Sequence, residues 1–420
     1  MLAAVAAAPS IAETLVFPPY GHSYGIRKAT PKHLFMFFGP LTSFADPQGL
    51  ATAKMQSRDD PSTEKDDDEL VVYGVNSDRH EIIYNTSMWT LDRYGSRGDG
   101  VGEFKYPRGV ATEPGGNVYV VDSGNNRIVH LFNPQRKVRW VKAFGGGEGG
   151  EALRDPSQIG LTARGSMYVT DTGNRRIVAF AASGEVLRTI PADGTELFEE
   201  GPTTLGVADG REAWSHFEED RAIFCADMNG RRLWKLSFDG RVRKRVRMPE
   251  GHSAYYGAVD YYHNFWVTDR TNHCILKFDR NLELLDIVGS FGDGDFQFRQ
   301  PRGIAIWKRY GQTFVAEEKG AQYYWMGTDK KSAHLRRNDK GTWVLHTNLT
   351  AFSYAALFKA ENADTLYYIT KRRIPSGKAE SPISIRRGKA LRPGARLTLR
   401  LKPTYSSYTY YHWDYPITAR

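Results

Sequence analysis

The chain has 420 residues, of which 40% are hydrophobic and 25% charged, with 41 glycines and 20 prolines. This composition excludes collagen, a coiled coil and a wholly disordered chain, and without a run of 18 apolar residues we expect no transmembrane helix. The aromatic content of 13% favours strands and the glycines and prolines indicate turns, so the sequence predicts an all-β protein.

The N-terminal segment, residues 1–30, opens with an apolar, alanine-rich stretch followed by small residues. It is either the remnant of an export signal without its basic start or an alanine-rich terminus. The two cysteines, Cys225 and Cys274, exclude a disulfide framework and a Cys-rich metal site but leave one bridge open. Together these features favour a secreted, periplasmic or cell-surface protein.

A repeat begins after this segment and is clearest in two copies, at residues 98–132 and 155–180. Each copy has a turn, a proline, a short strand ending in Asp, a tight turn with Asn, and a second strand. This alternation is typical of an antiparallel meander. Six polar residues that end a strand mark six copies, spaced 42–56 residues apart, which fits one four-stranded blade each: Asn76, Asp122, Asp171, Asp227, Asp269 and Glu317. We expect these six side chains to stabilise turns.

The pattern GxGxFxxPxGxA followed by VYVxDxxNxRI resembles the NHL repeat. The resemblance implies a six-bladed β-propeller over residues 31–326. Residues 32–39 take the place that residues 91–95 and 142–145 hold before other copies, so they are predicted to be an outer strand that closes the last blade.

The repeat stops near residue 326, and the polar stretch 327–340 is predicted to be a linker. Residues 341–420 contain six or seven short predicted strands, among them the alternating Arg396–Lys402, and predict a small immunoglobulin- or fibronectin-like β-sandwich. From Gly327 to Arg420 there are 18 Lys and Arg against 6 Asp and Glu, whereas the rest of the chain has 39 against 42. This basic domain is therefore a candidate for an anionic partner, unless its charge is only a solvated surface.

Candidate ligand-binding residues come from the start of each innermost strand, which in a propeller lies at the mouth of the axial channel. The residues after each blade's proline are Gln48, Arg108, Ser157, Thr203, Tyr256 and Arg302. The two arginines, each in Pro-Arg-Gly, would either clamp an anionic group or form salt bridges.

No histidine occupies these positions. Peptide-amidating lyases, which resemble NHL propellers, place metal-binding histidines around the channel. His263 and His273 form the closest pair in one blade and have no third ligand at repeat spacing. The sequence therefore predicts no catalytic set, no metal and no cofactor.

Two classes of function compete on this basis. The favoured hypothesis is a non-enzymatic interaction scaffold that binds protein or glycan partners in an extracellular or cell-surface assembly. The alternative is an axial-channel, metal-dependent hydrolase or lyase, lactonase-like or peptide-amidating-lyase-like. Nucleic acid is disfavoured as a partner because the propeller is close to neutral, and phosphate binding needs clustered Lys and Arg.

Overall fold

The computed structural model describes residues 14–16, 28–54, 70–87, 90–147, 149–191, 196–212, 215, 217–307, 311–359, 366–369, 373–385, 391–403 and 412–420. The chain divides into two compact units: Phe17–Trp325, here the propeller unit, and Met1–Val16 with Met326–Arg420, here the C-terminal unit. Within the described ranges no helix has the length and apolar character needed to cross a membrane. Most of the predicted N-terminal segment 1–30 lies outside the described residues.

The propeller unit is built of successive antiparallel sheets in which neighbouring strands pair in chain order. The first sheet contains β3 (Pro47–Lys54), β4 (Leu70–Asn76), β5 (Glu81–Asn85) and β6 (Leu91–Tyr94). The second contains β7 (Val110–Thr112), β8 (Asn117–Asp122), β9 (Arg127–Phe132) and β10 (Arg139–Phe144). The third contains β11 (Pro156–Leu161), β12 (Met167–Asp171), β13 (Arg176–Phe180) and β14 (Val186–Ile190).

Three further sheets follow the same plan. The fourth contains β15 (Pro202–Ala208), β16 (Ala222–Asp227), β17 (Arg232–Leu236) and β18 (Val242–Arg247). The fifth contains β19 (Tyr256–Val259), β20 (Phe265–Asp269), β21 (Cys274–Phe278) and β22 (Leu284–Val288). The sixth contains β25 (Ile304–Trp307), β26 (Gln312–Glu317), β27 (Gly320–Met326) and, paired with β27, β2 (Lys28–Ala29). Between the fifth and sixth sheets, β23 (Ser290–Phe291) and β24 (Gln297–Phe298) form a short parallel pair.

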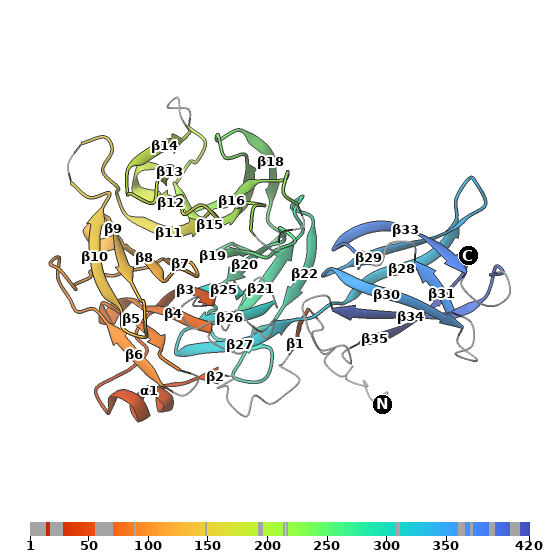
Figure 1. Cartoon of the computed structure of the whole chain (residues 1–420), viewed down its shortest axis with the longest axis horizontal. Coiled ribbons are helices and arrows are strands. Elements are labelled where there is room, and N and C mark those ends of the chain that lie inside the picture. Colours follow the sequence, from red (N-terminus) through yellow and green to blue (C-terminus); the bar gives the residue numbers. More distant parts are fainter. Residues whose placement is uncertain are drawn as a thin grey trace, which may run out of the picture. The chain divides into compact units, whose positions relative to one another are not determined.

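The innermost strands form a closed circle. Each of β3, β7, β11, β15, β19 and β25 lies against the next, and β25 lies against β3 (Figure 1). Apolar side chains from adjacent sheets share the core, as Val75 and Val120 do between the first and second sheets. The predicted all-β propeller fold is therefore confirmed.

At five of the six strand ends the polar side chain accepts a hydrogen bond from a loop amide, as expected, whereas the buried carboxylate of Asp227 has no hydrogen-bond partner among the described residues. The carboxylate of Asp122 accepts hydrogen bonds from the backbone N–H of Lys105 at 2.6 Å and from Asn125 Nδ2 and Arg127 Nε, both at 2.8 Å. Asp171 accepts the equivalent bond from the N–H of Arg154. The acid thus ties the loop before its sheet to the turn after its strand.

The strand predicted at 32–39 is wrong, because these residues belong to a helix, α1 (Pro31–Phe38). Pro31 occupies the first helical turn, where its missing N–H is no loss, and the N–H of Thr30 donates to His33 Nδ1 at 3.1 Å. Within the propeller unit, the N-terminal strand that pairs with the last sheet is β2, in which Lys28 lies opposite Gln322. Closure by an N-terminal strand thus uses residues 28–29.

The C-terminal unit contains β1 (Leu15–Val16) and a sheet of eight strands. The sheet comprises β28 (Lys330–Arg337), β29 (Trp343–Leu349), β30 (Ser353–Lys359), β31 (Leu366–Ile369), β32 (Arg373–Ile374), β33 (Gly377–Ile385), β34 (Arg396–Pro403) and β35 (Trp413–Thr418). Its order is β28-β29-β33-β31-β30-β34-β35, with β32 beside β30.

The strand pairing in this unit bears on two predictions. The predicted linker 327–340 is wrong, since it contains β28, which pairs with β29 from Lys330↔Leu349 to Arg337↔Trp343. A bridge between Leu335 and Ala419 joins the first and last strands of the sheet around a core that includes Leu345 and Leu399. Strand β33 pairs with β29 over Gly377–Pro382 and with β31 over Ile383–Ile385, so it connects two groups of strands around this core, and the sandwich stays a prediction.

Candidate functional site

Glycines at the start of the innermost strands let the sheets approach one another closely. The N–H of Gly49 donates to the carbonyl of Arg108 at 2.8 Å, and the N–H of Gly303 donates to the carbonyl of Gln48 at 3.1 Å. A Cβ on Gly49 would lie 2.6 Å from the Tyr256 hydroxyl and 2.7 Å from the Arg108 carbonyl, so a larger residue would not fit. The Pro-x-Gly sequence of the repeat thus allows neighbouring sheets to pack closely.

The six predicted site residues follow one another around this end of the axis, here called the closed end. Gln48 contacts Gly303, Arg108 contacts Gly49, and the Ser157 hydroxyl donates to the carbonyl of Thr203 at 3.2 Å. The carbonyl of Arg302 accepts a bond from Thr268 Oγ1 at 2.7 Å. The sequence therefore located a real cluster.

Most of their polar groups bind neighbouring protein groups. Arg302 is buried and its guanidinium pairs with Asp46. Arg108 lies 3.5 Å from Asp155, and both side chains are about half exposed. The Ser157 hydroxyl is within hydrogen-bond distance of Thr170 Oγ1 and the Thr203 hydroxyl donates to the carbonyl of Asp227. The two arginine pairs connect loops of neighbouring sheets, whereas the two hydroxyl contacts lie within the third and the fourth sheet. A ligand role for the six residues stays a prediction.

Two side chains fill the axis at the closed end. Tyr256 comes from the fifth sheet, and its hydroxyl accepts a hydrogen bond from the N–H of Val110 in the second. The second and fifth sheets are opposite one another in a ring of six, so this bond spans the axis. Burial raises the pKa of Tyr256, which keeps its hydroxyl neutral.

Gln158 is the second of the two side chains, and together with Tyr256 it is here called the plug. Its Nε2 donates to the carbonyls of Leu205 at 2.8 Å and Gly257 at 2.6 Å, and its Oε1 accepts from the N–H groups of the same two residues at 2.9 and 3.3 Å. One side-chain amide of the third sheet thus provides hydrogen-bond partners for backbone groups of the fourth and fifth sheets.

The opposite end of the axis is hollow. All six innermost strands begin at the closed end, so their later residues line this second end, here called the axial cavity. Its volume is about 690 Å³. All six sheets contribute to the lining, which includes Leu50–Lys54, Val110–Pro114, Gln158–Ala163, Leu205–Val207, Tyr256–Val259, Tyr261 and Ile304–Trp307.

Three Lys or Glu side chains lie on the axial cavity, those of Lys54, Glu113 and Glu212. Glu113 stabilises its own turn, because its carboxylate accepts from the N–H of Gly115 at 2.8 Å and from the N–H and Nδ2 of Asn117 at 3.1 and 2.6 Å. Lys54 is buried at the end of β3, and Glu212 is half-buried in the loop after β15. Because both line the cavity beyond the repeated motif, Lys54 and Glu212 are the residues that we consider for binding or proton transfer.

Sequence reasoning missed these cavity residues for different reasons. Gln158 had a signal, since it replaces the glycine that other copies have two residues after the proline, as in Gly49 and Gly109. Lys54 and Glu212 had none, because they lie outside the repeated motif. Tyr256 is the one predicted residue among the described lining of the cavity.

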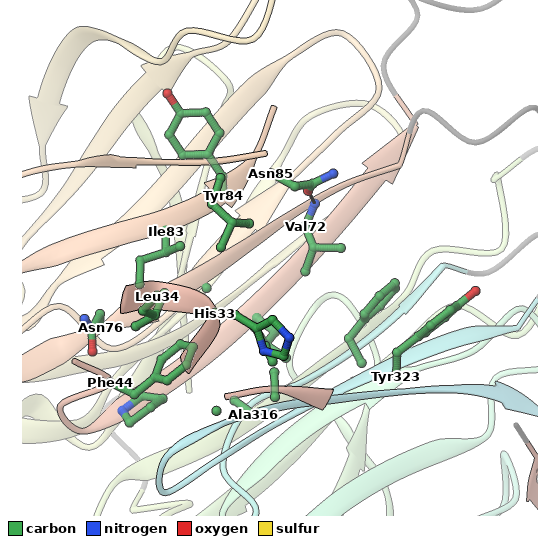
Figure 2. A pocket seen from close by; sticks show the side chains of 18 of the residues that line it. His33, Leu34, Phe44, Val72, Asn76, Ile83, Tyr84, Asn85, Ala316 and Tyr323 are labelled. Atoms are coloured by element: carbon green, nitrogen blue, oxygen red, sulfur yellow. Dashed lines mark hydrogen bonds between the residues drawn. The ribbon is translucent and has the colours of Figure 1, made fainter. Parts of the chain in front are cut away.

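A second, smaller cavity of about 280 Å³ lies between the first and sixth sheets beside α1. Val72, Ala316 and Tyr323 surround it (Figure 2). The lining residues that the structure describes include no Lys, Arg, Asp or Glu, and His33 on its rim is bound to Thr30. It is an apolar gap between sheets with little to orient a ligand.

The two histidines considered from the sequence do not converge. His263 is buried, with Nε2 3.1 Å from Ser215 Oγ and Nδ1 3.1 Å from the carbonyl of Asp220. His273 Nδ1 instead accepts from the N–H of Gln300 at 3.0 Å. Both have structural partners. Cys225 and Cys274 are buried and free, so the bridge left open by the sequence does not form.

Solved structures with related folds include two lyases and a lactonase. A virginiamycin B lyase from Staphylococcus aureus is 15% identical, with a TM-score of 0.43, covering 61% of this chain and 77% of that one. A streptogramin B lyase structure is 11% identical, with a TM-score of 0.45, covering 69% and 96%. A gluconolactonase from Xanthomonas campestris is 12% identical, with a TM-score of 0.48, covering 68% and 88%. Likeness at this level assigns no activity to the chain.

Comparison by sequence gives one family match. No curated protein matches the chain. The family model of the NHL repeat matches residues 104–131, which run from the loop before β7 through β9. The second sheet of the ring is therefore built around an NHL repeat.

Proposed function

We propose that the propeller binds a small organic molecule in the axial cavity. The observation that carries this proposal is a hollow of about 690 Å³, lined by all six sheets and stopped at its base by Gln158 and Tyr256. Pockets for small ligands have volumes of about 300–1,000 Å³ and a few polar groups on mostly apolar walls.

The lining indicates the chemistry of the ligand. Ile159, Val207 and Ile306 supply apolar wall, and Trp307 and Tyr261 supply aromatic surface. The Lys54 ammonium is suited to a carbonyl or carboxylate oxygen. We therefore expect a molecule with both apolar and polar groups, among them an ester, a lactone or a carboxylate.

The proposal extends to catalysis: the axial cavity would then hydrolyse its ligand or cleave it as a lyase. Lys54 and Glu212, which both line the cavity, would provide an acid and a base. The described lining does not fit a metal cage, because its carboxylates are Glu113 and Glu212 and the first is held by its own turn. The proposal therefore uses no metal in the cavity.

A substitution that fills the cavity tests the binding proposal. Ala258 lines the cavity, so Ala258→Trp should abolish saturable binding of aryl esters and lactones measured by titration calorimetry. Ala182→Trp, in the exposed turn between β13 and β14, is the matched control and should bind as the wild type does. Binding that survives Ala258→Trp would refute the site. Loss of turnover with retained binding in Glu212→Gln would support the enzyme form.

A second candidate function is an interaction scaffold, favoured by a basic hollow in the C-terminal unit. This hollow, of about 470 Å³, is lined by His334, Arg336, Arg337, Trp343, Pro393 and Arg420. It suits an acidic protein segment or an anionic glycan. The double variant Arg336→Ser/Arg337→Ser should elute from a heparin column at lower salt than Arg392→Ser, and equal elution would count against this surface.

A secreted, periplasmic or cell-surface location belongs to the scaffold proposal. It rests on the composition of the N-terminal segment. Fractionation of the native host tests it, and recovery of the protein with an intact Met1 from the cytosol alone would overturn it.

A further inference from the structure

The strand end of the fifth sheet differs from those of the second and third at the position five residues after the buried acid. In the second and third sheets an arginine five residues after the buried acid donates to it, Arg127 to Asp122 and Arg176 to Asp171. In the fifth sheet the acid is Asp269, and the residue five positions later is Cys274. A thiol has replaced the cation.

A second departure converges on the same acid. In the second sheet, the loop amide that binds the acid follows the buried Phe104. In the third sheet, the equivalent amide follows the buried Leu153. In the fifth sheet the amide is that of Ser253, which donates to Asp269 Oδ2 at 3.1 Å, and the residue before it is His252. An imidazole thus stands where the other sheets place an apolar side chain.

The three side chains meet at one point. His252 Nδ1 lies 2.9 Å from Asp269 Oδ2 and 3.8 Å from Cys274 Sγ, and the three atoms all lie within 4.8 Å of one another. Asp269 and Cys274 are buried, and the His252 side chain is 21% exposed. Across the part of the chain that the structure describes, no other group of three His, Cys, Asp or Glu side chains is placed to hold a metal ion.

We propose that His252, Asp269 and Cys274 bind one zinc ion. Thiolate, imidazole and carboxylate are all ligands of zinc, at about 2.3, 2.0–2.1 and 2.0–2.2 Å, which in a tetrahedron separates the donor atoms by about 3.3–3.6 Å. The observed 2.9 and 3.8 Å bracket this range, so small side-chain rotations suffice. Solvent reaches the site along His252 and supplies the fourth ligand.

The proton balance is simple. Binding removes the thiol proton of Cys274, which goes to solvent, and the imidazole stays neutral with its proton on Nε2. No oxidant or reductant takes part. The hydrogen bonds that Asp269 Oδ2 accepts from the Ser253 N–H and from Asn272 Nδ2 at 2.7 Å would orient the carboxylate toward the ion.

A purely structural role explains only half of this arrangement. His252 as a hydrogen-bond donor to Asp269 would substitute for the missing arginine. That role needs no cysteine at position 274 and no sulfur within 3.8 Å of the same nitrogen. The metal accounts for both replacements and gives the fifth sheet a cation at the place where Arg127 and Arg176 provide one.

Cobalt titration of the full-length, metal-free protein tests the site. Co²⁺ replaces Zn²⁺ and gives a near-ultraviolet thiolate-to-metal absorption band. We expect this band to saturate at one equivalent in the wild type and to be abolished by Zn²⁺. In Cys274→Ser the band should be absent, and in His252→Phe, which restores the residue type of the second sheet, affinity should fall at least tenfold.

The matched control is Cys225→Ser, which removes the other buried thiol, in the fourth sheet. It should retain the band, and circular dichroism should show that each variant is folded. Absence of the band from the wild type would overturn the proposal. So would a band that persists in Cys274→Ser or unchanged affinity in His252→Phe, and His252→Phe decides the matter if Cys274→Ser does not fold.

Discussion

The two ends of the propeller axis are built from the same six strands but differ in what occupies the middle. At the closed end, glycines bring the sheets together, and Tyr256 and Gln158 bind backbone groups of other sheets. At the other end the same strands enclose a cavity of about 690 Å³.

The difference shows that residues inside the repeated motif and residues outside it have different roles. The Pro-x-Gly sequence that recurs in the first, second and sixth sheets serves packing, and residues outside the motif, such as Lys54 and Glu212, line the cavity. In a chain of repeats, function is therefore sought where copies diverge, as at Gln158, rather than where they agree.

The largest expected effect is at Gln158. Gln158→Leu leaves buried N–H and C=O groups of Leu205 and Gly257 without their four hydrogen bonds, which should lower the free energy of unfolding by about 3 kcal/mol. Urea denaturation measures this loss. Gln297→Leu, which removes one exposed bond to Gly294, should cost under about 1 kcal/mol and serves as the control. Equal costs would show that the plug has no special role.

A smaller effect is expected at Arg302. Its buried guanidinium pairs with Asp46 and donates to the carbonyl of Pro47 at 3.2 Å. Arg302→Met leaves a partly exposed carboxylate that water can solvate, so we expect a loss of about 2 kcal/mol in the same denaturation assay. A neutral result would mean that the closed end tolerates loss of its cation.

Tyr256 should give a pH-dependent effect. Tyr256→Phe loses the bond to Val110 and should cost about 1 kcal/mol at pH 7. Because burial raises the folded-state pKa of this phenol above its unfolded value of about 10, the wild type loses stability as the pH rises above 10. The variant lacks this loss, so its deficit should shrink in alkaline solution. A constant deficit from pH 7 to 11 would contradict the buried, neutral hydroxyl.

The smallest effect is expected at Arg108, the other arginine that lies in a Pro-Arg-Gly sequence. Its pair with Asp155 is half exposed and 3.5 Å long, so water and salt screen it. Arg108→Met should change the free energy of unfolding by less than about 0.5 kcal/mol. A cost equal to that of Arg302→Met would show that the motif, rather than burial, sets the energy.

The local sequence predicted the strands and turns well because the same pattern of strand and turn residues occurs in several copies. It failed at residues 32–39, where an apolar run suits a strand but Pro31 and the contact of Thr30 with His33 start a helix. It failed again at 327–340, where the polar strand β28 is held by pairing with β29 and by one buried side chain, Leu335.

The sequence by itself determined the all-β class, the repeated sheets and the cluster of residues at the start of the innermost strands. These follow from alternation, turn residues and spacing, which act over a few neighbouring positions. Only the tertiary structure decided that Gln158 binds Gly257 and that Cys274 meets His252. The partners are 99 and 22 residues apart in the chain, and only the folded sheets bring them together. The sequence could not predict the cavity for the same reason, since its walls come from all six sheets.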